Sequence, residues 1–173
     1  SLYVLLMGGF LGVVTKTGAL DAGIGAVVKK LNGKELLLIP ILMFIFSLGG
    51  TSYGMSEETL AFYALVTATM MAAGFDSLTA VATIALGAGS GVLGSTVNPF
   101  LVSTSIDSLK VVGIATNQAV VIGIGVALWL SSLLISIFFV MNYAKKVKND
   151  KEASILSQRE YDNAKEAFMD NNE

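Results

Sequence analysis

Apolar segments of unequal length alternate with short polar ones along this chain, and their lengths predict its elements. Leu36–Phe46 and Leu60–Ala73 contain about 11 and 14 residues, so as helices they would rise about 16 and 21 Å. The hydrocarbon core of a bilayer is about 30 Å thick, and neither segment crosses it comfortably. Because residues 47–58 between them are polar and glycine-rich, the pattern predicts a re-entrant helical hairpin over residues 35–76. Two closely packed full spans would leave the chain on the same side.

Residues 77–118 predict a broken transmembrane helix followed by an outer connector. The apolar run Leu78–Leu86 leads into a stretch of glycine, serine and threonine, and Pro99 biases Asn98 away from helical conformation. We therefore expect the helix to unwind near Gly94–Pro99, which would free backbone groups for other partners.

Three further segments complete an all-α integral membrane architecture. Residues 1–34 predict the end of a transmembrane helix and an interfacial connector. In the helix end, Gly8 and Gly12 either allow close helix packing or occur by chance, since glycine is common in membrane helices. Residues 119–143 form the long apolar stretch and predict a complete transmembrane helix. Residues 144–173 are rich in charge and predict a cytosolic linker or tail, in which Tyr161, Ala164 and Phe168 could form one or two weak amphipathic turns.

The distribution of lysines predicts the orientation. Lysines cluster in residues 16–34 and again in residues 145–151, whereas the connector after the broken helix contains only Lys110. Positive residues remain on the cytoplasmic side of bacterial inner membranes. We therefore expect residues 16–34 and 144–173 to face the cytoplasm in a multi-pass inner-membrane protein surrounded by lipid.

Composition supports the membrane assignment and removes several kinds of chemistry. Hydrophobic residues make up 54% of the 173 positions and charged residues 14%, which is typical of an integral membrane protein. The chain contains no Cys and no His, so disulfides, thiolate metal sites and the commonest general base are absent from it. We expect no cofactor and no enzyme activity. Since Ser1 opens inside an apolar run, we also expect that the chain is cut from something longer.

The adjacent carboxylates of Glu57 and Glu58 are the first candidates for a binding site. An acidic residue inside a membrane costs roughly 2.5–3.5 kcal/mol unless water or a partner relieves it. At the end of a short hairpin, this pair would suit a cation, a proton relay or a cationic substrate group. The alternative is that Ser56 and the two acidic residues only cap the second arm.

Two loops provide the other candidates, because unwound backbone and hydroxyl groups can bind ions and small polar ligands inside a membrane. The first contains Gly49, Gly50, Thr51 and Ser52; the second contains Gly94, Ser95, Thr96, Asn98 and Pro99. Alternatively, the glycines only allow a tight turn, and the second loop is a proline-kinked helix with internally satisfied polar groups. The remaining acidic residues at segment ends are expected to be caps or surface charges: Asp21, Asp76 and Asp107.

Four motifs resemble one known family. They are Gly8–Gly25, Asn32–Pro40, F-S-L-G-G-T-S-Y-G-M-S-E-E-T at Phe46–Thr59, and G-V-L-G-S-T-V-N-P-F at Gly91–Phe100. Over about residues 2–143 the chain resembles the YfcC-like branch of the C4-dicarboxylate anaerobic carriers, in the ion-transporter superfamily. The resemblance implies half of an inverted-repeat secondary transporter, with one hairpin and one broken helix in each repeat. The hairpin tip and the helix break would form half of the binding site.

The same resemblance implies ion-coupled or exchange transport of a C4-dicarboxylate or a basic amino acid, with Na⁺ or H⁺ as the coupling ion. The partner would be the second repeat of the carrier, with a homodimer also open, and nucleic acid is not expected. Glu57 and Glu58 fit a cationic amine better than a dianion. A non-transporting scaffold or a truncated carrier fragment is the alternative.

Overall fold

A computed structural model of the chain describes residues 34–168 and, before them, positions 9, 13, 16, 17 and 26. The expected GxxxG pair, the cap at Asp21 and most of the connector before residue 34 lie outside these described residues. Within residues 34–168 the regular structure is entirely helical. The longer helices are α3 (Leu38–Tyr53), α4 (Leu60–Ala72), α5 (Ser77–Leu93), α6 (Thr104–Val111), α7 (Gln118–Asn149) and α8 (Gln158–Phe168). Short 3₁₀ or π turns are η1 (Glu35–Leu37), η2 (Glu57–Thr59), η3 (Pro99–Ser103) and η4 (Lys151–Ala153).

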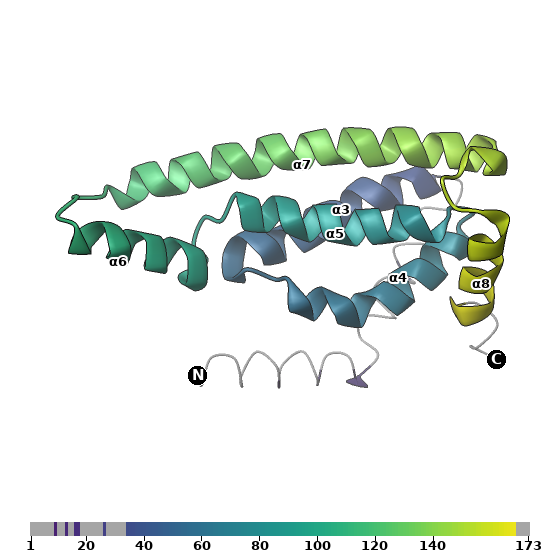
Figure 1. Cartoon of the computed structure of the whole chain (residues 1–173), viewed down its shortest axis with the longest axis horizontal. Coiled ribbons are helices and arrows are strands. Elements are labelled where there is room, and N and C mark those ends of the chain that lie inside the picture. Colours follow the sequence, from purple (N-terminus) through teal and green to yellow (C-terminus); the bar gives the residue numbers. More distant parts are fainter. Residues whose placement is uncertain (1–8, 10–12, 14–15, 18–25, 27–33, 169–173) are drawn as a thin grey trace.

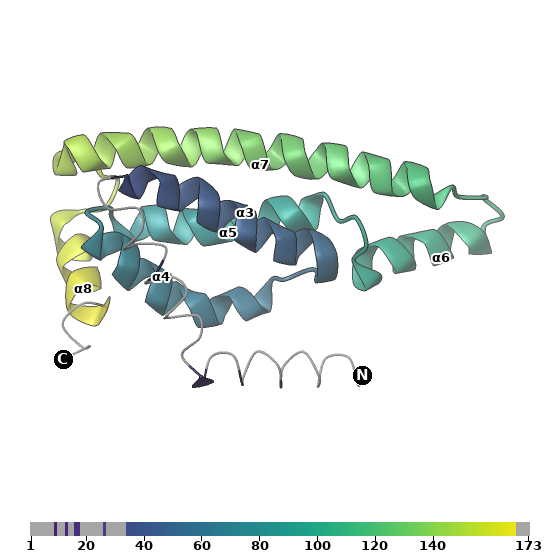
Figure 2. The same cartoon turned by 180° about the vertical axis from the view of Figure 1, so that it is seen from behind.

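The long helices lie nearly side by side in three layers (Figures 1 and 2). Helices α3 and α5 form the middle layer, with α7 on one side and α4 on the other, and α5 contacts all three. Helices α3 and α5 run in the same direction, whereas α4 and α7 run in the opposite one. Both middle helices therefore end at the same level, and α6 projects beyond them.

The first arm of the predicted hairpin is longer than its apolar stretch. The helix begins with η1 and continues to Tyr53, so Glu35–Tyr53 contains 19 residues and rises about 28 Å. By length and composition it is one of the two candidate membrane spans among the described residues. The expectation of a short first arm with an irregular tip at Gly49 and Gly50 is therefore wrong. The turn comes later, where Gly54 has a φ of 81° and the backbone N–H of Met55 donates to the Gly49 carbonyl.

Close packing against α5 explains why Gly50 stays helical. Added at Gly50, a Cβ would overlap the carbonyl of Ala88, and at Gly91 it would overlap the carbonyl of Ser47. Helices α3 and α5 therefore meet backbone to backbone, which is typical of small-residue interfaces in membranes. This contact offsets the intrinsic cost of glycine inside a helix.

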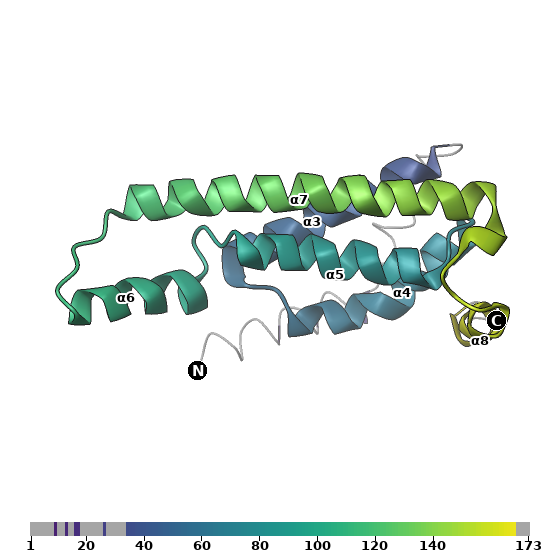
Figure 3. The same cartoon turned by 45° about the horizontal axis from the view of Figure 1, so that its top comes forward.

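The last long helix is the second candidate span. Helix α7 contains 32 residues and is about 48 Å long, which exceeds the 119–143 stretch expected from apolarity alone. Most of its large apolar side chains are exposed, among them Leu134, Phe138 and Phe139. Figure 3 shows it spanning most of the length of the molecule.

The segment expected as a charged linker or tail contains a folded element. Helix α8 packs against α4, with Tyr161 and Ala164 on its half-buried face. Its N-terminus is capped reciprocally, because Ser157 donates its hydroxyl to the Glu160 carboxylate at 2.7 Å and the Glu160 N–H points back to that hydroxyl.

Candidate functional site

The end of α3 is hydrogen-bonded to the non-helical segment that follows α5. The Thr51 hydroxyl donates to the Gly94 carbonyl at 2.8 Å, and the Thr96 N–H donates to the Thr51 carbonyl at 3.1 Å. The two threonine hydroxyl oxygens are 3.2 Å apart. Residues that are 45 positions apart in the chain thus form one cluster of hydroxyls and carbonyls.

The interruption lies within the stretch for which the sequence predicts unwinding. Helix α5 ends at Leu93, and the next helical turn, η3, begins at Pro99. Asn98 is 1% exposed and caps this second half, because its Oδ1 accepts from the Phe100 N–H at 2.9 Å. Its Nδ2 donates to the Ser95 hydroxyl at 3.3 Å. The amide also lies where a Cβ on Gly54 would be, so the α3–α4 turn and the break touch.

Helix α7 packs against the back of the break. A Cβ on Gly94 would overlap the backbone of Trp129, and one on Gly125 would overlap the carbonyl of Ser95. The Trp129 indole N–H is buried, and it has no hydrogen-bond partner within the part of the chain that the structure describes.

The contact between Gly94 and Trp129 shows at which level of α7 the break lies. Trp129 lies about 11 residues after Gln118 and about 20 before Asn149, which corresponds to about 16 and 30 Å along the helix. The site is therefore far from both ends of the longest helix, as Figure 1 also shows.

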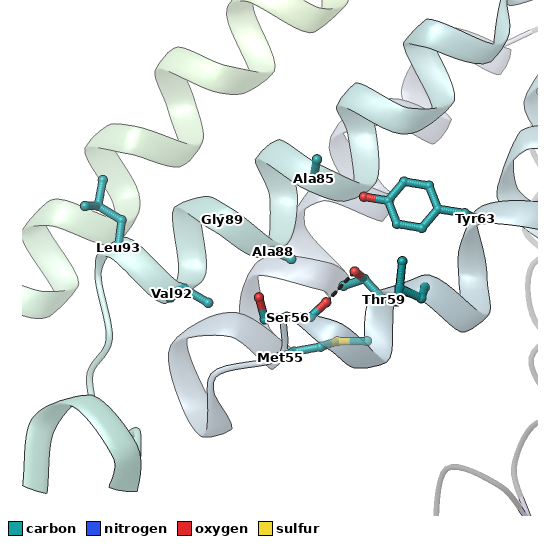
Figure 4. A pocket seen from close by; sticks show the side chains of 10 residues that line it. Met55, Ser56, Thr59, Tyr63, Ala85, Ala88, Gly89, Val92 and Leu93 are labelled. Atoms are coloured by element: carbon teal, nitrogen blue, oxygen red, sulfur yellow. Dashed lines mark hydrogen bonds between the residues drawn. The ribbon is translucent and has the colours of Figure 1, made fainter. Parts of the chain in front are cut away.

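A groove of about 620 Å³ opens beside the cluster, between the start of α4 and the last turns of α5. Its walls are mainly apolar and small on the α5 side, where Ala85, Ala88 and Gly89 contribute. On the α4 side it has Ser56, Thr59 and Tyr63, whose hydroxyl is turned toward α5 in Figure 4. The groove could receive a small molecule with both apolar and polar parts.

The structure brings together many of the predicted loop residues: Gly50, Thr51, Gly94, Ser95, Thr96 and Asn98. Ser52 is not among them, because it is exposed and its hydroxyl donates to the Leu48 carbonyl of its own helix at 2.6 Å. Gly49 faces Met55 of the turn. For Glu57 and Pro99 only the backbone is described, at the first positions of η2 and η3.

The Glu58 carboxylate forms its hydrogen bond locally, in the turn that leads into α4. Its carboxylate accepts from the Ser56 N–H at 3.2 Å, and the Thr59 hydroxyl donates to the Ser56 carbonyl at 2.6 Å. Both bonds lie in the turn that contains η2, whereas α4 itself has no side-chain hydrogen bond at its N-cap, Thr59. A carboxylate that is only half-buried remains able to exchange this bond for another partner.

Sequence reasoning missed Gly125, Trp129 and Tyr63 and misjudged the surroundings of Asp76. The glycine inside an apolar helix and the single tryptophan of the chain were the available signals for α7. Asp76 caps α5, since its Oδ1 accepts from the Thr79 N–H at 2.8 Å, but it is fully buried and not a surface charge. Asp107 is exposed and pairs with Lys110.

The groups of this cluster that could bind an ion or a ligand are hydroxyl and carbonyl oxygens and one side-chain amide. Among residues 34–168 and the isolated described positions, no group of three or more His, Cys, Asp or Glu could hold a metal ion. Oxygen atoms from an unwound helix and a helix end are the ligands that membrane carriers use for small cations and polar substrates.

The described residues form an all-helical structure with two helices long and apolar enough to cross a membrane, which is consistent with a membrane transporter. The chain belongs to the C4-dicarboxylate anaerobic carrier family, whose family model matches residues 1–173.

Two curated proteins are similar to the chain. One, from Escherichia coli K12, is described as "Putative basic amino acid antiporter YfcC" and is 34% identical over 149 residues, which cover 86% of this chain and 28% of that protein. The other, an uncharacterized protein from Haemophilus influenzae, is 31% identical over 153 residues, 88% of this chain and 29% of that protein. The chain thus spans less than a third of the length of these relatives. No solved structure matches it.

Proposed function

We propose that this chain supplies one half of the translocation site of a secondary carrier, which moves a small charged metabolite by ion coupling or exchange. The observation that carries the proposal is the meeting of the α3 end, the α5 break and α7 at Thr51, Gly94 and Trp129. Interrupted helices meeting near the middle of the membrane are the means by which many secondary carriers bind substrate. Membership of a carrier family supports transport over catalysis.

The level of the break supports a hairpin that enters the membrane without crossing it. If the apolar part of α7 spans the bilayer, Trp129 lies about 15 Å from Ala119 and about 22 Å from Ala144. The α3–α4 turn lies at the same level as the break (Figure 1). Together with η2, the second arm extends over residues 57–72, about 24 Å, which is shorter than the roughly 20 residues that a crossing needs.

Charge favours a substrate with a cationic group. All described lysines and the arginine of residues 34–168 lie outside the cluster and its groove, at residues 34, 110, 145, 146, 148, 151, 159 and 165. The start of α4 instead carries Glu57 and Glu58. A basic amino acid could place its ammonium or guanidinium group near these carboxylates and its own carboxylate on the hydroxyl groups of the break. The Escherichia coli relative, described as a putative basic amino acid antiporter, supports the same class.

Transport by the complete carrier in proteoliposomes tests the proposal. We expect uptake of labelled arginine or ornithine to depend on a counter-substrate or on a Na⁺ or H⁺ gradient. Glu57→Gln and Glu58→Gln should each reduce uptake at least tenfold, because each removes one of the two negative charges of η2, the turn beside the groove. Asp107→Asn, on exposed α6, is the matched control and should transport normally.

The results separate the parts of the proposal. Normal uptake in both glutamine variants would show that the site assignment is wrong. Gradient-dependent uptake of a C4-dicarboxylate, with none of basic amino acids, would overturn the substrate class. Absence of any gradient- or exchange-dependent uptake of either class would overturn carrier function.

A further inference from the structure

A second polar cluster lies at the opposite end of α5, and it surrounds a buried carboxylate. Asp76 is 0% exposed and links the turn after α4 to the first residues of α5. An ionised group in such a position persists only if hydrogen bonds replace the lost water. Its first oxygen accepts from the N–H and the hydroxyl of Thr79, both on its own helix.

The second oxygen is bound from two other parts of the chain. The Tyr143 hydroxyl of α7 and the Ser154 hydroxyl, which follows η4, each donate to it at 2.6 Å. In the part of the chain that the structure describes, no lysine or arginine pairs with Asp76. The carboxylate is therefore held by neutral donors, one of which comes from the segment after α7.

The backbone of that segment closes over the same groups. The Ile155 N–H donates to the Tyr143 hydroxyl at 3.1 Å, and the Leu156 N–H donates to the Ser154 hydroxyl at 3.2 Å. Helix α8 follows at once and packs against α4. The chain after α7 thus folds back onto the base of the α3–α4 hairpin in Figure 1 and contacts it at two places.

The charged groups nearby engage each other and not Asp76. Lys148 pairs with Glu35 at 2.6 Å, and its ammonium group lies 5.3 Å from the centre of the Phe75 ring. Phe75 is 1% exposed and precedes Asp76. Lys148 of α7 and Glu35 at the start of α3 thus hold the α4–α5 junction through Phe75. Neither charged group binds Asp76, whose carboxylate accepts from Ser154 instead.

We propose that Asp76 and Tyr143 form an intramolecular docking site for residues 150–168, which bind it through Ser154; the three residues together are here called the Asp76 latch. Docking supplies the Ser154 hydroxyl as a hydrogen-bond donor to the buried Asp76 carboxylate. When the segment leaves, the carboxylate loses this donor. Folding of the segment is thus coupled energetically to the α4–α5 junction. Because α4 lines the groove at its other end, a docked segment also restrains the groove; this consequence for transport rests on the proposed function.

The latch can be tested without any transport measurement. This chain contains no cysteine, so spin labels can be placed at Ala72→Cys on α4 and Lys165→Cys on α8, both exposed. The complete carrier would be studied in lipid nanodiscs, with any other cysteine replaced. We expect one narrow distance distribution in the parent protein.

Loss of single donors should release the segment. Ser154→Ala and Tyr143→Phe should each broaden the distribution and reduce the docked fraction at least twofold, and Asp76→Asn should do so further. Ser108→Ala, which removes an exposed hydroxyl bonded within α6, is the matched control and should leave the distribution unchanged. If Asp76→Asn fails to fold, the two donor variants still decide the question.

Unchanged distributions in both donor variants would overturn the latch. A released segment with unchanged uptake rates in the same variants would overturn its influence on the groove. Since the distance measurement needs no substrate, failure of the latch is distinguishable from failure of the carrier proposal.

Discussion

The two ends of α5 are both junctions between helices, but they are built from different chemistry. At the break, Thr51, Gly94 and Thr96 exchange hydrogen bonds between neutral hydroxyl and backbone groups. At the other end, Asp76 presents a carboxylate to four donor groups. Neutral hydrogen bonds contribute about 0.5–1.5 kcal/mol each, and those to charged groups about 1.5–3 kcal/mol. The break should therefore rearrange at lower cost than the base of the hairpin.

The comparison indicates which end can move during a transport cycle. Polar groups at the break satisfy one another, so a ligand with its own donors and acceptors can replace these contacts without leaving a charge unpaired. Disruption of the Asp76 cluster leaves a buried carboxylate short of donors, which costs more. We infer that α5 and the hairpin are fixed at the lysine-rich end of α7 and adjustable at the break.

The largest effect should come from adding a methyl group where the backbones of α3 and α5 touch, just before the break. In Gly91→Ala, the new methyl group overlaps the Ser47 carbonyl and the backbone N of Thr51, so α3 and α5 must separate. We expect a loss of about 3 kcal/mol in the free energy of unfolding, measured by thermal denaturation in detergent. Gly89→Ala on the same helix meets no atom within 4 Å and should be neutral or slightly stabilising. Equal stability of the two variants would contradict the close packing.

A smaller effect should follow from removing one neutral bond at the break. Thr51→Val keeps the shape of the side chain but loses the donor to the Gly94 carbonyl, which is 2.8 Å away. We expect the free energy of unfolding to fall by about 1–3 kcal/mol, because a buried acceptor loses its partner. Thr51→Ser keeps the hydroxyl and should retain most of the stability. The difference in the free energy of unfolding between the two variants, measured by denaturation, gives the contribution of this hydrogen bond. A valine variant as stable as the parent would show that the bond does not contribute to stability.

The smallest effect is a pH dependence of the docked segment that comes from Glu160, in the first turn of α8. Hydrogen bonds from the Ser157 hydroxyl and N–H lower the pKa of Glu160 below its ordinary value of 4.5. A lowered pKa in the folded state means stabilisation that is complete above about pH 4.5 and lost as pH falls through the folded pKa. We expect the docked fraction of α8, measured with the same spin labels, to decrease slightly in that acid range. Glu160→Gln should remove this dependence, and an identical pH profile in both proteins would contradict it.

Local chemistry made the helix break predictable. Asn98 and Pro99 act through the dihedral angles of adjacent residues, so their effect is visible in the sequence itself. The all-helical class and the carrier family were predicted from length, composition and motifs, and the family is confirmed. The roles of the predicted site residues remain predictions.

The length of α3 and the surroundings of Asp76 depend on residues far away in the chain. Gly49 and Gly50 are typical of a turn, but both lie inside α3, where Gly50 meets the backbone of α5. Asp76 has the sequence signature of a cap, and it is one, but the Tyr143 and Ser154 that bury it lie 67 and 78 positions further on. Periodicity and propensity contain no information on such pairings.

The length of α7 has a consequence for how the membrane acts on this protein. A hydrocarbon core about 30 Å thick needs about 20 helical residues, whereas α7 contains 32. The surplus turns must tilt within the bilayer or stand in the headgroups and water. Tyr143 and the segment after Asn149 belong to this end of α7, and both contact the base of the hairpin. A change in bilayer thickness that alters the tilt of α7 would therefore move the groups that hold Asp76.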